Sequence, residues 1–157
     1  MSPQEQSSPY KEQIGEILIK RGLINAKQLQ EALQVQKKEN GLLGAILIKL
    51  GYVSEIDVVV ALIIQCNLPY IAINKYELDP KILELIPRDI AREFGVIPID
   101  RVGSVLSVVM IDPLNEPIKE KLEKISGCKI APFIGTKSEI DAAFNKWYGD
   151  PKAAGQG

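Results

Sequence analysis

The sequence of 157 residues contains no histidine, which removes the commonest general base and the commonest protein ligand of metal ions. Its two cysteines, Cys66 and Cys128, do not have the spacing of a metal or redox motif. Reduced thiols are therefore the better interpretation than a disulfide, as in a cytoplasmic protein. Neither a metal site nor a disulfide framework is expected.

Several catalytic motifs are also missing. The chain has no Gly-x-x-x-x-Gly-Lys-Ser/Thr loop to hold ATP phosphates, and no Gly-x-Ser-x-Gly or His-Glu-x-x-His motif. Asp89 and Glu93 lie four residues apart on a predicted helix. A solvated helix face explains this pair better than an acid/base site does. We therefore expect no enzymatic activity and no catalytic residue.

Charge of one sign and long apolar runs are lacking as well. The net charge is −1, and no cationic stripe with interleaved aromatic residues is present, so we expect no DNA or RNA partner. The longest apolar run, residues 58–64, is far shorter than the roughly 20 residues that cross a bilayer. Residues 1–10 do not resemble a signal peptide. The sequence predicts a cytoplasmic protein that does not span a membrane.

What the sequence does contain is one unit that occurs twice. Copy one is residues 13–36 and copy two is residues 42–65, so each has 24 residues and five residues separate them. Self-similarity at a fixed period indicates a repeat architecture. Nine positions are identical between the copies: Gly15/Gly44, Ile17/Ile46, Leu18/Leu47, Ile19/Ile48, Lys20/Lys49, Gly22/Gly51, Ala32/Ala61, Leu33/Leu62 and Gln36/Gln65.

Each copy predicts two helices joined by a short turn. Gly22 and Gly51 end the first helices, because glycine takes the left-handed conformation without a Cβ clash. Asn25 and Ser54 begin the second helices, each followed three residues later by a side chain that completes a capping box. The second helix of copy two, residues 55–66, is apolar on nearly every side. It is therefore predicted to be buried and central.

The rest of the chain predicts a mixture of short strands and helices. Strands are expected at residues 70–73, 96–99, 105–110 and 129–134. The predicted fold class is α+β, a tandem helical-hairpin repeat followed by a small mixed α/β subdomain. The expected order is a disordered tail at 1–10, the repeat at 11–68, the α/β subdomain at 69–149 and a second tail at 150–157.

Gly15 and Gly44 are unusual because they lie early in predicted helices. A glycine there costs about 1 kcal/mol relative to alanine. The same cost at equivalent positions of both copies suggests that something approaches the backbone there. Either another helix packs on the glycines or a ligand lies on them. Gln36 and Gln65, which end the two copies, could form a paired polar site.

The doubled pattern resembles the MshEN domain, the N-terminal domain of ATPases that drive type II secretion and type IV pilus assembly. The pattern is hydrophobe-Gly-x-x-hydrophobe-hydrophobe-x-x-Gly, then two spaced hydrophobes and a final Gln. Those last three are Leu29, Leu33 and Gln36 in copy one. The segment at residues 86–98 and the Asp112-Pro113 loop also resemble this family.

Some members of this family bind cyclic di-GMP. The resemblance implies that such a ligand would contact Gln13, Ile14, Gly15, Gln36, Leu42, Leu43, Gly44 and Gln65. The members that bind it typically have arginine before the Leu-Gly pair, where this chain has Gln13 and Leu42.

We therefore favour a non-enzymatic regulatory or docking domain. The resemblance implies that its partners are proteins of the secretion or pilus machinery, at the inner-membrane platform. A cyclic di-GMP-sensing module is the alternative, and no other cofactor is expected. Both an excised domain of an ATPase and a separately encoded regulator remain open.

Overall fold

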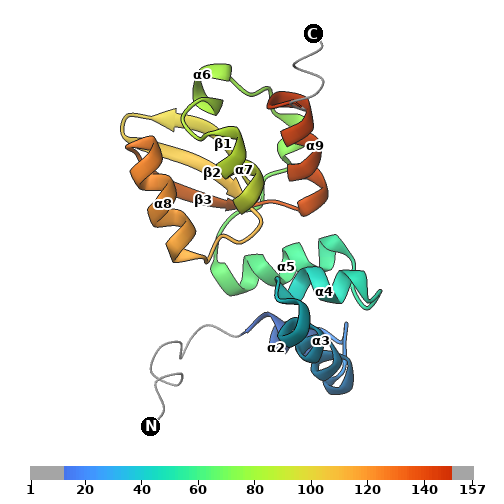
Figure 1. Cartoon of the computed structure of the whole chain (residues 1–157). Helices are drawn as coiled ribbons and strands as arrows, with labels where there is room; N and C mark the ends of the chain where they lie inside the picture. The colour runs from blue at the N-terminus through green and yellow to red at the C-terminus, as the bar shows by residue number, and fades with distance from the viewer. Residues whose placement is uncertain (1–12, 150–157) are drawn as a thin grey trace. The chain divides into compact units, whose positions relative to one another are not determined.

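The computed structural model describes residues 13–149, and the tails predicted at residues 1–10 and 150–157 lie outside this range. The chain divides into two compact units, Met1–Asn67 and Leu68–Gly157, here called unit 1 and unit 2. The described part of unit 1 is helical, whereas unit 2 combines helices with a small sheet (Figure 1). The fold class is therefore α+β, as the sequence predicted.

Unit 1 contains two helical hairpins. The first consists of α2 (Ile14–Lys20) and α3 (Ala26–Glu39), and the second of α4 (Leu43–Lys49) and α5 (Glu55–Cys66). Gly22 and Gly51 occupy the turns after the short first helices, with φ angles of 75° and 81°. This left-handed conformation costs glycine little.

Both second helices begin with a complete capping box. The Asn25 side chain accepts from the backbone N–H of Gln28 at 2.8 Å, and the Gln28 side chain accepts from the backbone N–H of Asn25 at 2.9 Å. Ser54 and Asp57 form the same reciprocal pair in the second hairpin, at 3.2 and 2.9 Å. Two backbone donors that a helix start leaves unpaired are satisfied in each case.

The main helix–helix contacts in unit 1 join the two hairpins. Helix α2 packs with α5, α3 packs with α4, and the two short helices α2 and α4 also touch. Their shared core contains Leu18 and Leu47, which are completely buried and occupy the same repeat position. Ala32 and Ala61, another identical pair, are also completely buried. The two copies therefore contribute matching residues to one common core.

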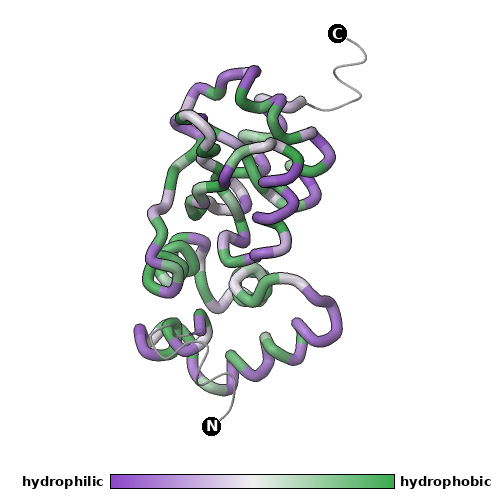
Figure 2. Tube along the Cα trace, turned by 90° about the vertical axis from the view of Figure 1, so that its left-hand side faces the viewer, coloured by the Kyte–Doolittle hydropathy of each residue, from purple (hydrophilic) through white to green (hydrophobic). Residues whose placement is uncertain are grey.

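The burial pattern repeats along with the sequence. Residues 13–24 and 42–53 show the same order of exposed, half-buried and buried positions, except that Arg21 is exposed and Leu50 is half-buried. In Figure 2 the helices alternate between hydrophobic and hydrophilic positions, as helices with one inward face do. The same local fold thus arises twice from the same inward positions.

Helix α5 departs from the prediction that it is buried on nearly every side. Val58, Val59, Ala61 and Cys66 are buried. However, the Ile56, Ile63 and Ile64 side chains are 59%, 39% and 51% exposed. These isoleucines and the half-buried Val60 follow a spacing of i, i+4, i+7 and i+8, which places them on one side of the helix. We call these four residues the apolar face of α5.

Unit 2 is built on a three-stranded sheet in the order β1-β2-β3. Strands β1 (Val96–Val102) and β2 (Val105–Met110) are antiparallel, and β3 (Lys129–Ile134) lies parallel to β2. A parallel neighbour needs a crossover, and α8 (Glu116–Ser126) provides it.

Shorter helices and a C-terminal helix complete unit 2. They are the 3-10 helix η1 (Ile73–Lys75), α6 (Pro80–Leu83), α7 (Arg88–Phe94) and α9 (Lys137–Trp147). Helices α6, α7 and α9 contact β1, and α8 contacts β3. The core of unit 2 lies between these helices and the sheet, with strand residues such as Leu106 and Val108 completely buried.

The strand predicted at residues 70–73 is wrong. Tyr70 makes only an isolated parallel bridge to Ile134, and Ile73 already begins η1. The Ile71 backbone N–H still donates to the Ile134 carbonyl at 2.9 Å, so this segment lies along the end of β3 for one position. An apolar run of four residues is too short for periodicity to distinguish a strand from other buried structure.

Candidate functional site

The candidate site consists of the motif positions that both copies share. Gln13 and Leu42 are the residues just before α2 and α4, and both have extended backbone conformations. Both side chains are exposed. The two positions that arginine occupies in the family members that bind cyclic di-GMP are therefore equivalent and accessible in this chain.

The next residues, Ile14 and Leu43, are half-buried and pack against the core of unit 1. A Cβ atom built on Gly44 would lie 3.7 Å from Ile14 Cδ1. The start of the motif in copy one is thus next to the motif glycine of copy two. The structure brings these parts of the two predicted half-sites together through the contact between α2 and α4.

The two motif glycines are explained by helix packing within each hairpin. A Cβ atom on Gly15 would lie 2.7 Å from Leu29 Cδ1, and one on Gly44 would lie 2.8 Å from Val58 Cγ1. Leu29 and Val58 occupy the same repeat position on α3 and α5. Both glycines are buried. In each hairpin a side chain of the second helix therefore lies closer to the glycine than a Cβ atom on it would normally allow.

The two motif glutamines have different surroundings. The Gln36 amide donates to the backbone carbonyl of Gly41 at 2.9 Å. This hydrogen bond connects the C-terminal part of α3 to the linker between the copies. Gln65 is half-buried near the end of α5. The Gln36 amide would have to leave the Gly41 carbonyl before its Nε2 could bond a base edge.

The charges around the candidate site offer little to an anion. Glu16 lies in the first turn of α2, while the equivalent residue of copy two is Ala45. The repeated lysine of copy two, Lys49, is directed to the Glu39 carboxylate at 3.5 Å. Among residues 13–149, the two positions directly before the motif helices, Gln13 and Leu42, bring no cationic group with which proteins usually hold phosphates.

Tyr52 makes a polar contact between the copies. The Tyr52 hydroxyl donates to the Glu31 carboxylate, which joins the turn of copy two to α3 of copy one. The pKa of Tyr52 is raised, first because this hydrogen bond favours the neutral phenol, and then by desolvation and the negative charge of Glu31.

The sequence prediction missed the apolar face of α5. On α3 the positions equivalent to Ile56, Val60 and Ile63 are Lys27, Glu31 and Gln34. The sequence already contained evidence for an exposed apolar face. The first hairpin folds with polar residues at these three positions, so the apolar residues of α5 are not required there for the hairpin to fold. An exposed cluster of large apolar side chains commonly marks an interaction site.

Residues 13–149 contain neither a helix that could span a membrane nor a cluster of side chains that could hold a metal ion. No helix among them combines the length and apolarity that crossing a bilayer requires. No group of three or more Cys, Asp or Glu side chains within the same range could hold a metal ion.

The architecture matches that of two solved structures. The N-terminal domain of XpsE shares this fold with a TM-score of 0.71 and 21% identity, over 87% of this chain and 94% of that one. The structure of MshE with cdg, which is cyclic di-GMP, matches with a TM-score of 0.75 and 28% identity, over 88% of this chain and 100% of that one.

The chain belongs to the MshEN domain family, which matches residues 66–154. The type IV pilus assembly ATPase PilB of Myxococcus xanthus strain DK1622 is 29% identical over 137 residues, which are 87% of this chain and 24% of that protein. The type II secretion system protein E of Xanthomonas campestris pv. campestris is 26% identical over 146 residues, 90% of this chain and 26% of that protein. The chain thus spans about a quarter of the length of these relatives.

Proposed function

We propose that this chain is a non-enzymatic regulatory and docking domain of the pilus and secretion ATPase type, and that it acts through protein–protein contacts. Membership of the MshEN family and similarity to PilB and to the type II secretion protein E support this proposal. Its partners are then proteins of the same pilus or secretion machinery. The cytoplasmic location expected from the sequence is part of the same proposal.

The apolar face of α5 is the observation that carries the docking function. Ile56 and Ile64 are more than half exposed. On α3 the positions equivalent to Ile56, Val60 and Ile63 are polar, and the position equivalent to Ile64 is Val35. Burying an exposed isoleucine against a partner contributes roughly 1.5–3 kcal/mol when burial becomes complete. A helix face of this kind suits a partner that presents an apolar helix or groove.

The test replaces the apolar face with the residues that copy one has at the same positions. The double variant Ile56→Lys with Ile63→Gln is compared with wild type for binding to purified cytoplasmic portions of the inner-membrane platform proteins, by biolayer interferometry. We expect the variant to bind at least about tenfold more weakly, a loss that corresponds to about 1.4 kcal/mol.

A matched control changes the equivalent positions of copy one, Lys27→Ala with Gln34→Ala, and should leave binding unchanged. Equal weakening by both double variants would contradict a docking role for α5. Absence of binding by the wild-type chain to every platform protein would contradict the docking function itself. A large loss of thermal stability in the α5 variant would show that this face is covered within the chain.

Sensing of cyclic di-GMP is the second candidate function. It is favoured by the similarity to MshE, whose structure was solved with this dinucleotide, and by the contact between Ile14 and Gly44 that joins the two motif starts. It is opposed by Gln13 and Leu42, because neither brings the charge or the planar donor fork with which arginine binds guanine and phosphate.

We therefore expect calorimetry to find weak or absent binding of cyclic di-GMP to the unmodified chain. The double variant Gln13→Arg with Leu42→Arg should bind more tightly, since both positions are exposed and can accept arginine without repacking. Gln30→Arg with Gln34→Arg, which adds the same charge on exposed positions of α3, is the control. Tight binding by the wild type would reverse the order of the two candidates, and no gain in the first double variant would exclude the motif as a site.

A further inference from the structure

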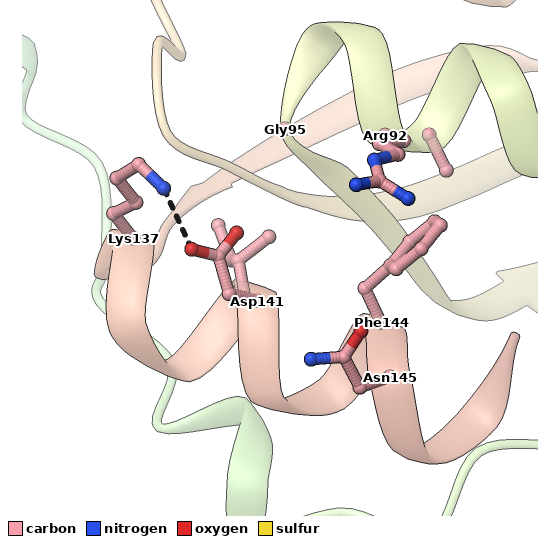
Figure 3. A pocket seen from close by; sticks show the side chains of 8 residues that line it. Arg92, Gly95, Lys137, Asp141, Phe144 and Asn145 are labelled. Atoms are coloured by element: carbon pink, nitrogen blue, oxygen red, sulfur yellow. Dashed lines mark hydrogen bonds and ion pairs between the residues drawn. The ribbon is translucent and has the colours of Figure 1, made fainter. Parts of the chain in front are cut away.

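Unit 2 contains a pocket that lies away from the repeated motif. It is formed between α7 and α9 and has a volume of about 370 Å³ (Figure 3). This volume is near the lower end of the range of roughly 300–1,000 Å³ that is usual for small-molecule sites. Neither the proposed docking face nor the candidate dinucleotide site uses any residue of this pocket.

The base of the pocket is formed by buried core residues of unit 2. Ala91 of α7 and Ile140 and Phe144 of α9 line it, and these side chains are only 1%, 2% and 6% exposed. Ile140 and Phe144 are four residues apart and therefore share one side of α9. These side chains are almost fully covered, so most of the lining that a ligand can reach is polar.

The rim carries three charged groups, of which two neutralise each other. Lys137 Nζ lies 2.6 Å from Asp141 Oδ2, within the same turn of α9. The third, the Arg92 guanidinium, has no ion pair with any residue in the range 13–149. Its central carbon lies 5.8 Å from the centroid of the Phe144 ring, and Figure 3 shows it above that ring. The pocket thus has one net positive charge.

We propose that this pocket binds the carboxylate of a small monoanionic acid through the Arg92 guanidinium at its rim. A guanidinium presents a planar donor fork that matches a carboxylate in a bidentate geometry. The contact with Phe144 restrains this fork at the edge of the pocket. Asn145, which also lines the rim, adds an amide donor.

The charge balance selects a carboxylate over a phosphate. A dianion would bring two negative charges against the single net positive charge, so one of its charges would have no partner in the pocket. The same chemistry is available from a free carboxylic acid and from the C-terminal carboxylate of a peptide.

The proposal is tested on the full chain by following backbone amide signals in a titration monitored by NMR. The probes are phenylacetate as a free acid, N-acetylphenylalanine as a peptide terminus, phenylacetamide as a neutral isostere and phenyl phosphate as a dianion. We expect saturable shifts of α7 and α9 signals with one or both carboxylates, none with phenylacetamide and weaker ones with phenyl phosphate. Tighter binding of N-acetylphenylalanine indicates a peptide terminus, and tighter binding of phenylacetate indicates a free acid.

Variants separate recognition from folding. Arg92→Gln should weaken carboxylate binding at least about tenfold, while Arg101→Gln, at an exposed arginine of β1, should not. Asp141→Asn should bring phenyl phosphate binding closer to that of phenylacetate. The proposal is overturned if the wild type shows no saturable shifts at millimolar probe, if the two arginine variants behave alike, or if phenylacetamide binds as well as phenylacetate.

Discussion

The two copies of the repeat differ most in character on their outward sides. Inward positions match: Leu18 and Leu47 are both completely buried, and Gly15 and Gly44 are both pressed by the second helix of their hairpin. Outward, α3 carries charged or amide side chains at three of the four positions that form the apolar face of α5, and Val35 at the fourth. The comparison shows that packing determines one side of each hairpin and leaves the other side free to be used for binding.

The largest expected effect concerns the inward positions, where the copies should be equivalent. Leu18→Ala and Leu47→Ala should each lower the free energy of unfolding of unit 1 by about 2–5 kcal/mol, because each leaves a cavity in the shared core. Urea denaturation followed by far-ultraviolet circular dichroism measures this loss. As a control, Glu16→Ala on the exposed side of α2 should change stability by less than about 0.5 kcal/mol. A small loss for only one of the two leucines would mean that the copies do not share the core equally.

A smaller effect should separate the two glycines. Gly44→Ala places a Cβ atom 2.8 Å from Val58 Cγ1, whereas Gly15→Ala meets the end of the more flexible Leu29. A β-branched side chain in a helix has essentially one rotamer, so Val58 cannot yield. Overpacking costs about 1–3 kcal/mol and is partly offset by the helix propensity of alanine. We expect Gly44→Ala to destabilise by about 1 kcal/mol and Gly15→Ala to be nearly neutral.

A double-mutant cycle tests the reason for this difference. In a Val58→Ala background the cost of Gly44→Ala should disappear, because the methyl group that it meets is gone. If Gly44→Ala destabilises the Val58→Ala variant as much as it destabilises the wild type, the strain does not arise from the contact between residues 44 and 58.

The outward positions should tolerate exchange. Ile56→Lys with Ile63→Gln, which gives α5 the residues of α3, should change the free energy of unfolding by less than about 1 kcal/mol, since exposed substitutions usually have small effects. Thermal denaturation compares this variant with Val58→Lys, an inward substitution on the same helix that should prevent folding of unit 1. Severe destabilisation by Ile56→Lys with Ile63→Gln would contradict the claim that this side of α5 does not contribute to the core of unit 1.

The smallest effect concerns the contact between Tyr52 and Glu31. The pKa of Tyr52 is raised above the ordinary value of about 10 by this hydrogen bond. The phenol therefore stays neutral to higher pH in the folded chain, and any stabilisation is present below pH 10 and is lost as the pH rises past the raised pKa. Glu31→Gln should lower the pKa of Tyr52, seen as an earlier rise in absorbance at about 295 nm. Burial raises the pKa of Tyr148 too, so Tyr52→Phe is needed to identify the signal.

Local features of the fold could be predicted from the sequence because their causes are local. The capping boxes at Asn25 and Ser54 depend on side chains within three residues, and the turns at Gly22 and Gly51 depend on one residue each. The pairing of α2 with α5 could not be predicted in this way. It depends on contacts between residues about 40 positions apart, to which helical spacing gives no guide.

The candidate site was less predictable for a related reason. The repeated glycines indicated a close approach but not what approaches, and only the structure identifies Leu29 and Val58. The role of the eight motif residues in ligand binding stays a prediction. For α5 the error has a clear physical source. Apolar composition indicates what a helix can bury, but it does not indicate whether the covering surface belongs to the same chain.

Each hairpin packs its helices against those of the other hairpin, since α2 contacts α5 and α3 contacts α4. This arrangement affects how the sequence of unit 1 can evolve. A lone hairpin would find partners for its helices only in a second lone hairpin, and the pair would be symmetric and dependent on concentration. In a symmetric pair, every substitution on an outer surface appears twice. Joining the hairpins through Asn40 and Gly41 makes the pairing independent of concentration and lets one surface change alone. The outer surface of α3 is mostly polar and that of α5 is apolar, which is a difference that a symmetric pair of identical hairpins could not have.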